Sequence, residues 1–301
     1  MVEEWVSKKE PHVVYALEPG EYVLHEEQVP TEQGYVRAED VKFVVEETVD
    51  VQKVKMEDDH TKVSISKTDI TDGKEIEGAK LQILDQDGEV VESWTTGEEH
   101  LIEYLPVGTY TLHEEAAVDG YIVANDVEFT VEETGEIQKV KMEDERAMGQ
   151  LVIVKTDTDS KAALEGVEFV LLEKETGEEV GRLKTGKDGK AVSELLPIGT
   201  YKNGVFKEPI TYVLKETATL KGYEKTEEEW EIVFTYQNDK TPVIEVVKEI
   251  QNKKIPETPG TVKPGPKTGD DTNWFLPLLA LGVSAGMVAG LLYYRKRHKK
   301  A

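Results

Sequence analysis

Two sets of three polar side chains recur at matching places in the chain, and their chemistry would suit a covalent cross-link. The sets, in chain order, are Lys67, Glu114 and Asp144, followed by Lys155, Glu216 and Asn252. A lysine that has lost its proton is a nucleophile, and a neutral glutamic acid can polarise the carbonyl that the amine attacks. Attack on the third side chain would form an amide. Water would leave from the aspartic acid, or ammonia from the asparagine, with the glutamate shuttling the protons.

Strand parity predicts that each of these six side chains ends a buried face. Residues two apart share one face of a β-strand. Val63 and Ile65 therefore share the face of Lys67, and Tyr110 and Leu112 share that of Glu114. The segments around the other members show the same parity. Burial favours the uncharged forms of lysine and glutamic acid, which are the forms that amide formation needs.

A buried ion cluster is the alternative interpretation of these residues. Buried charges are costly unless they are paired, so a Lys/Glu/Asp set could persist as a salt-bridged group without a covalent bond. The set that ends in Asn252 fits this alternative less well, because asparagine brings no charge.

The elements that must position these residues belong to an internal repeat. Residues 34–59 and 120–145 agree at 17 of 26 positions, with a period of 86 residues, and a diverged copy follows. Such self-similarity indicates a tandem array. The predicted domains are a truncated repeat at 1–59 and two further repeats at 60–146 and 147–254.

An all-β fold of antiparallel β-sandwiches is predicted for these repeats. Short alternating segments rich in Val, Ile, Thr and Tyr are separated by Asp-Gly, Thr-Gly and Pro-x-Gly turns. An insert at 202–211 is expected to be a long surface loop. The first repeat keeps Glu26 and Asp58 but has no lysine strand before them, so its triad is incomplete. It begins in the middle of the unit, without a secretory signal, and we expect the chain to be the C-terminal part of a longer exported protein.

The motifs of the second and third repeats resemble those of a known domain family. They are K-T-D, L-P-x-G-x-Y, Y-x-L-x-E followed by G-Y, and a closing strand that ends in Asp or Asn. This order is similar to the Cna B-type, or SpaA-like prealbumin-fold, domains of Gram-positive adhesins and pilins. The resemblance implies spontaneous isopeptide bonds between Lys67 and Asp144 and between Lys155 and Asn252. Glu114 and Glu216 would be the catalytic residues.

The C-terminal region predicts a transmembrane helix. Residues 274–294 carry no charge, and the tail at 295–301 contains five basic residues. A helix of this length spans roughly 30 Å, the hydrocarbon thickness of a bilayer. The basic tail would remain in the cytoplasm and the body would lie outside.

The Pro-rich linker at 255–273 resembles the cell-wall sorting signal of Gram-positive surface proteins. Its motif is Pro266, Lys267, Thr268 and Gly269, followed by the apolar span and the basic tail. The resemblance implies that sortase cuts after Thr268 and transfers it to an amine of peptidoglycan or of a pilin. Gly265 stands where the family has Leu, so the class of sortase stays open. A second candidate at 255–260 has a proline directly after its threonine and is interpreted as linker.

Composition excludes several other functions. The chain has 61 acidic and 36 basic residues, a net charge of −25 and no cysteine. Disulfides, thiol nucleophiles and thiolate metal sites are therefore excluded, and the acidity argues against nucleic-acid binding. The histidines show no metal-ligand spacing, and no phosphate loop or hydrolase-like nucleophile motif occurs. We expect no metal, no cofactor and no enzymatic action on an external substrate.

These observations predict a stalk of adhesin type in the cell wall of a Gram-positive bacterium. Its precursor would be inserted in the membrane, with an extracellular body made rigid by isopeptide bonds. Two alternatives remain open: a minor or basal pilus subunit, and a module that itself binds host matrix or glycan.

Overall fold

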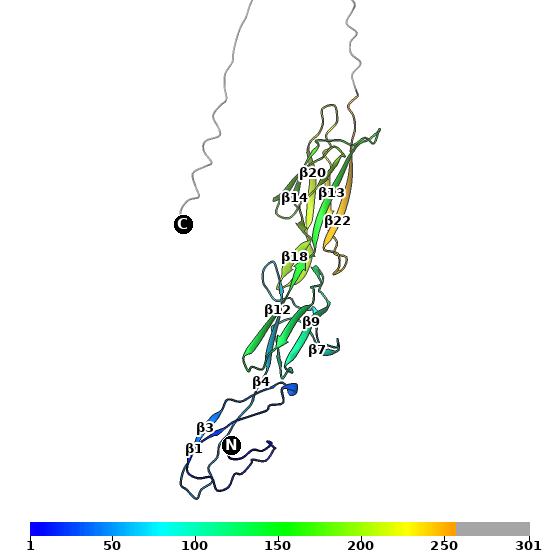
Figure 1. The fold of residues 1–301 in the computed structure, drawn as a ribbon. Helices are drawn as coiled ribbons and strands as arrows, with labels where there is room; N and C mark the ends of the chain where they lie inside the picture. The colour runs from blue at the N-terminus through cyan, green and yellow to red at the C-terminus, as the bar shows by residue number, and fades with distance from the viewer. Residues whose placement is uncertain (257–301) are drawn as a thin grey trace, which may run out of the picture. The chain divides into compact units, whose positions relative to one another are not determined.

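The computed structural model describes residues 1–256, which form strands β1 to β22 and one short 3-10 helix, η1 (Thr31–Gln33) (Figure 1). The all-β prediction is confirmed for this part of the chain. No helix within residues 1–256 is long and apolar enough to cross a membrane. The predicted membrane span at 274–294, the basic tail and the motif at 266–269 lie outside the described residues.

The second repeat (60–146) consists of two four-stranded sheets around a common apolar core. The first sheet has the spatial order β10 (Tyr121–Ile122), β12 (Ile137–Arg146), β5 (Lys62–Asp69) and β8 (His100–Glu103). The second has the order β11 (Val127–Val131), β9 (Gly108–Ala116), β6 (Lys80–Leu84) and β7 (Val90–Thr95).

One pairing departs from the predicted antiparallel pattern. The opening strand β5 and the closing strand β12 are parallel neighbours, with Lys67 opposite Met142 and Asp69 opposite Asp144. The cause is the turn between β11 and β12, which moves the chain from one sheet to the other, so that the last strand runs beside the first in the same direction. The two ends of the repeat are thereby brought into one ladder.

The third repeat (147–254) has the same design. In its first sheet β13 (Met148–Asp157) pairs with β16 (Lys190–Val192), β17 (Leu196–Pro197) and β22 (Val243–Asn252). The second sheet has the order β15 (Glu179–Lys184), β14 (Glu168–Glu173), β20 (Thr211–Ala218) and β21 (Glu229–Val233). The opening and closing strands β13 and β22 are again parallel, with Asp157 opposite Asn252.

The insert of the third repeat is a hairpin, and its prediction as a surface loop was wrong. Strands β18 (Gly199–Lys202) and β19 (Val205–Pro209) pair with each other. Contacts of an aromatic side chain explain why the insert is an ordered hairpin. The Tyr201 hydroxyl donates to the carbonyl of Gly120 at 2.9 Å, and its ring lies edge-on to Tyr121.

The first repeat is only partly paired. Strand β1 (Gly20–Leu24) pairs with β3 (Val41–Val45), and β2 (Tyr35–Val36) pairs with β4 (Asp59–His60). Residues 51–58 have nearly the sequence of β12 yet form no strand. The reason is that the described residues include no counterpart of β5 beside them, and a strand needs a neighbour for its backbone hydrogen bonds.

Candidate cross-linking sites of the second and third repeats

Both predicted triads are buried inside the sandwiches. The exposed fraction is 0% for Lys155 and Asp144, and it is at most 4% for the other four members. In each repeat the lysine and the Asp or Asn come from the two parallel strands of one sheet, and the glutamate comes from the facing sheet. The structure thus brings together the six residues predicted from parity.

Alternation along each strand explains why the sequence buries these groups. In β13 the buried positions from Leu151 onward are Leu151, Ile153, Lys155 and Asp157, while the residues between them are partly exposed. The aliphatic stem of the lysine continues the apolar stripe, as long charged side chains commonly do. Its ammonium group also lies 5.7 Å from the ring centre of Phe169.

The polar atoms of the third repeat form a closed ring of hydrogen bonds. Lys155 Nζ lies 2.6 Å from Oδ1 of Asn252 and 2.8 Å from Oε2 of Glu216. Asn252 Nδ2 in turn donates to Oε1 of Glu216 at 2.6 Å. One glutamate therefore contacts both the amine that would attack and the amide nitrogen that would leave.

The second repeat has the same arrangement with an acid as acceptor. Lys67 Nζ contacts Oδ1 of Asp144 and lies 2.9 Å from Oε2 of Glu114. The backbone N–H of Ala124 donates to that same Oε2 at 2.7 Å and so fixes the glutamate. The other carboxylate oxygens, Glu114 Oε1 and Asp144 Oδ2, are buried without a hydrogen-bond partner. A proton on one of these two carboxyl groups would supply the donor that both oxygens lack.

Burial shifts the ionisation of these sites toward their neutral forms. Desolvation raises the pKa of Asp144 to about 7, although Lys67 beside it acts in the opposite direction. In the third repeat, desolvation lowers the pKa of Lys155 against the opposing effect of Glu216. A neutral carboxylic acid and a neutral amine are the reactants that condensation to an amide requires.

The first repeat does not assemble a site in the described structure. Glu26 accepts a hydrogen bond from the Ala38 backbone N–H at 3.0 Å, which repeats the contact between Ala124 and Glu114. Asp58, however, is exposed. The incomplete triad predicted from the sequence is therefore not brought together.

Sequence reasoning missed one buried residue next to each site. Asp69 and Asp157 lie two positions after the lysines, on the same face, and are 0% and 4% exposed. The D of the K-T-D motif and its parity with the lysine were the available signal. Asp69 Oδ2 accepts hydrogen bonds from the Tyr121 hydroxyl at 2.7 Å and from Arg146 Nε at 2.6 Å.

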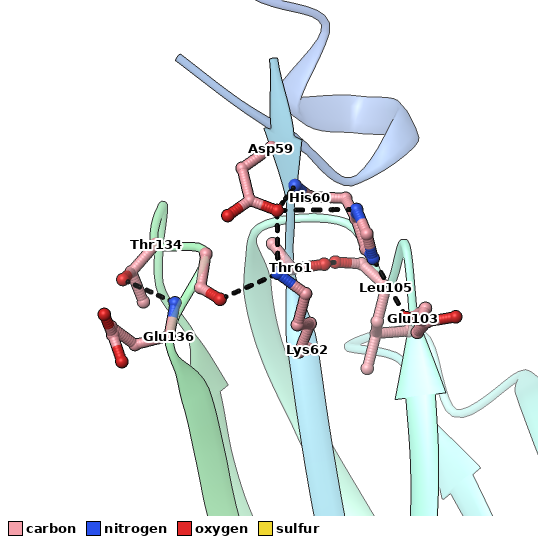
Figure 2. A network of polar contacts seen from close by, with 9 residues as sticks. Asp59, His60, Thr61, Lys62, Glu103, Leu105, Thr134 and Glu136 are labelled. Carbon is pink, nitrogen blue, oxygen red and sulfur yellow. Dashed lines mark hydrogen bonds and ion pairs between the residues drawn. The ribbon is translucent and has the colours of Figure 1, made fainter. Parts of the chain in front are cut away.

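A separate polar network holds the start of β5, at the opposite end of that strand from Lys67 (Figure 2). Lys62 Nζ donates to Asp59 at 2.7 Å and to the carbonyl of Gly135 at 2.9 Å. The Thr61 hydroxyl donates to the carbonyl of Leu105 at 2.6 Å. The bond from Lys62 to Gly135 ties the start of β5 to the turn before β12. Neither this network nor any other group of His, Asp or Glu in residues 1–256 has a metal-binding arrangement.

Comparison with known proteins assigns both complete repeats to one family of domains. A family model described as a SpaA prealbumin-like fold domain matches residues 61–146 and 149–250. No curated protein matches the chain significantly.

Among solved structures, the chain is similar to the Bacillus anthracis TIE protein, with 29% identity and a TM-score of 0.49. That match covers 79% of this chain but only 43% of the other protein. A streptococcal ancillary pilin is 19% identical, with a TM-score of 0.30 and coverage of 80% of this chain and 76% of its own. The shaft pilin SpaA of Lactobacillus rhamnosus GG is 15% identical, with a TM-score of 0.26, and the match covers 66% of this chain and 99% of the pilin.

Proposed function

Because the chain belongs to the SpaA family of prealbumin-like fold domains, we propose that it is a covalently stabilised stalk on the surface of a Gram-positive cell. The chemistry in this proposal is internal to each repeat. Lys155 becomes joined to Asn252, and Lys67 becomes joined to Asp144. The protein acts on no external substrate.

The observation that carries the proposal is the ring of Lys155, Glu216 and Asn252. Nζ of the neutral lysine attacks Cγ of Asn252, and a C–N bond forms. Glu216 takes a proton from Nζ through Oε2 and delivers one to Nδ2 through Oε1. The bond from Cγ to Nδ2 then breaks and ammonia leaves, so the carboxyl group ends with as many protons as it had at the start.

In the second repeat the leaving group is water. Lys67 attacks Cγ of Asp144, and Glu114 transfers a proton from the amine to a hydroxyl oxygen of the acid. The partnerless buried oxygens of the two carboxyl groups support this assignment, because a neutral acid would place a proton between them. The amide product also removes the buried charges, which are costly in an apolar core.

The topology gives these bonds a mechanical role. Opening and closing strands are parallel neighbours in both repeats, so tension on the chain shears their hydrogen-bond ladder. With the cross-links formed, tension passes from Lys67 to Asp144, along the chain to Lys155, and on to Asn252. The intervening segments at 68–143 and 156–251 then bear no load.

Attachment of this stalk to the cell wall is the second part of the proposal. Sortase would cut after Thr268 and transfer the chain to peptidoglycan, and a Thr268→Ala variant should remain in the membrane fraction. Thr258→Ala, in the neighbouring Pro-rich segment, is the matched control and should reach the wall normally. Wall attachment of Thr268→Ala would overturn this assignment. A sortase-dependent ladder on gels would instead indicate a minor or basal pilus subunit.

Tandem mass spectrometry of digested protein tests the cross-links site by site. The proposal expects a branched peptide in which Lys155 is joined to the Asn252 side chain with loss of ammonia. It expects a second one that joins Lys67 to Asp144 with loss of water. Linear peptides alone, with both lysines unmodified, would contradict the proposal.

A further inference from the structure

Asp69 is fully buried beside the second cross-linking site, yet its hydrogen bonds go to other groups than the reacting amine. Its Oδ1 accepts the backbone N–H of Thr71 at 2.7 Å, and its Oδ2 accepts the Tyr121 hydroxyl and Arg146 Nε. Burial opposes ionisation of this carboxyl, but the bonds from Tyr121, Thr71 and Arg146 outweigh it and lower its pKa. Asp69 is therefore a fixed anion, and its hydrogen bonds all come from groups other than Lys67.

One of these bonds connects the strand that carries Lys67 to the segment that orients Glu114. Asp69 stands two residues after Lys67, at the end of β5. Tyr121 lies in the segment that follows β9, three residues before Ala124, whose N–H fixes Oε2 of Glu114. The bond between Asp69 and Tyr121 thus joins the lysine strand of one sheet to the segment that orients the glutamate of the facing sheet.

The corresponding aspartate of the third repeat, Asp157, is held by the turn that follows it. Oδ1 of Asp157 accepts the backbone N–H groups of Ser160 at 2.7 Å and Asp159 at 2.9 Å. The hydrogen bonds from Ser160 lower the pKa of Asp157 to about 2. Tyr223 forms a β-bridge to Lys254, as Tyr121 pairs with Arg146. Lys254 takes the place of the arginine, and Ser160 and Asp159 hold Asp157 in place of a tyrosine hydroxyl.

We propose that Asp69 is a positioning residue for amide formation, which holds the strand of Lys67 in register with Glu114 of the facing sheet through Tyr121 of the G-Y segment. This inference rests on the proposed cross-linking. Its physical basis is that a condensation depends steeply on the geometry of the attacking atom, and a displacement of about 1 Å can cost on the order of a hundredfold in rate.

Removing one hydroxyl group tests the role of the tie. In the full chain, Tyr121→Phe should slow closure of the second repeat on the order of tenfold or more. Closure is followed in cell-free synthesis, with samples quenched in denaturant at timed intervals and mapped by mass spectrometry. In each variant the untouched repeat is the internal standard.

Two other buried tyrosines provide matched controls. The Tyr110 hydroxyl donates to the carbonyl of Pro106 at 2.9 Å, and that of Tyr212 donates to Pro197 at 2.7 Å, both away from the aspartates. Tyr110→Phe and Tyr212→Phe also lose one buried hydrogen bond but should close at the parent rate. Melting temperatures in a Glu114→Gln background, which blocks cross-linking of the second repeat, show whether Tyr121→Phe and Tyr110→Phe cost similar stability.

The outcomes separate the two proposals. Slow closure of Tyr121→Phe together with normal closure of Tyr110→Phe, at similar melting temperatures, supports positioning. Equal closure rates in Tyr121→Phe and the parent chain overturn the positioning role and leave cross-linking intact. A parent chain that never loses water or ammonia overturns the proposed function itself.

Discussion

Lys155 Nζ lies 2.6 Å from Oδ1 of Asn252, although the two residues are 97 positions apart in the chain. The parallel pairing of β13 with β22 brings them together, and the other two bonds of the ring pass through Glu216. A single amide at this point closes almost the whole repeat into a loop. Chain-entropy arguments assign about 4.7 kcal/mol to a cross-link that closes a loop of roughly 100 residues.

The first prediction concerns the glutamates. Glu216→Gln keeps the size of the side chain but cannot shuttle a proton, so the third repeat should fold without losing ammonia. Its free energy of unfolding should fall by about 4 to 5 kcal/mol relative to the cross-linked parent. Denaturant unfolding measures this change. Glu208→Gln, at an exposed position in β19, is a control that should change neither mass nor stability. A Glu216→Gln variant that still loses ammonia would rule out the shuttle.

The second prediction is a difference in pH dependence between the two sites. The reaction needs an uncharged site, and Asp144, with its pKa raised by burial to about 7, ionises above that value. The charges of Lys67 and Glu114 cancel, so ionisation of Asp144 gives the second site a net negative charge. The site then holds one proton fewer than amide formation requires. Its closure rate should therefore fall about tenfold per pH unit above 7. The third site has no acid at the acceptor position and should close at a nearly constant rate between pH 6 and about 8.

The same pKa shift predicts how the stability of the second repeat depends on pH before its cross-link forms. Asp144 has an ordinary pKa of 3.8, and the folded, unlinked repeat raises it to about 7. The contribution of Asp144 to stability is fully present below pH 3.8 and is lost as the pH rises through 7. Unlinked chains trapped during cell-free synthesis should consequently be more sensitive to protease at pH 8 than at pH 6. Equal sensitivity at both pH values would contradict the shift.

The third prediction exchanges the leaving groups. Asn252→Asp should make the third repeat lose water in place of ammonia, and it should acquire the decline in rate above neutral pH. Asp144→Asn should do the reverse in the second repeat. Intact mass and timed closure measure both effects. If each repeat keeps its original pH dependence of closure after the exchange, the acceptor residue does not determine that dependence.

The two triads could be predicted from the sequence because strand parity is a local property. Each of the six residues follows an apolar residue two positions earlier, and the structure buries all of them. The parallel pairing of β5 with β12 was not predicted, since it depends on where the chain crosses between sheets. The hairpin at β18 and β19 was missed because its order comes from contacts such as that of Tyr201 with Gly120, far away in the sequence.

The role of Asp69 could not be predicted from the sequence for a similar reason. K-T-D and G-Y appear as separate motifs, and only the fold places Tyr121 against Asp69. The orphaned oxygens of Glu114 and Asp144 likewise follow from side-chain geometry, which a pattern of residue types does not contain.

The fourth prediction is mechanical. Pulling on the two ends of the parent chain should not extend the second and third repeats, because their covalent path bypasses the folded segments. In a Glu114→Gln variant the segment at 68–143 becomes free to unfold and should add roughly 250 Å of contour length. Single-molecule force spectroscopy measures this step. A step of that length in the parent chain would mean that the second repeat is unlinked.

The intact mass of the purified full chain tests the central claim most directly. The account predicts a mass below the calculated value by one water plus one ammonia, with the water restored in Glu114→Gln and the ammonia restored in Glu216→Gln. A parent chain with the full calculated mass would contradict it, and the buried triads would then be ion clusters without a covalent bond.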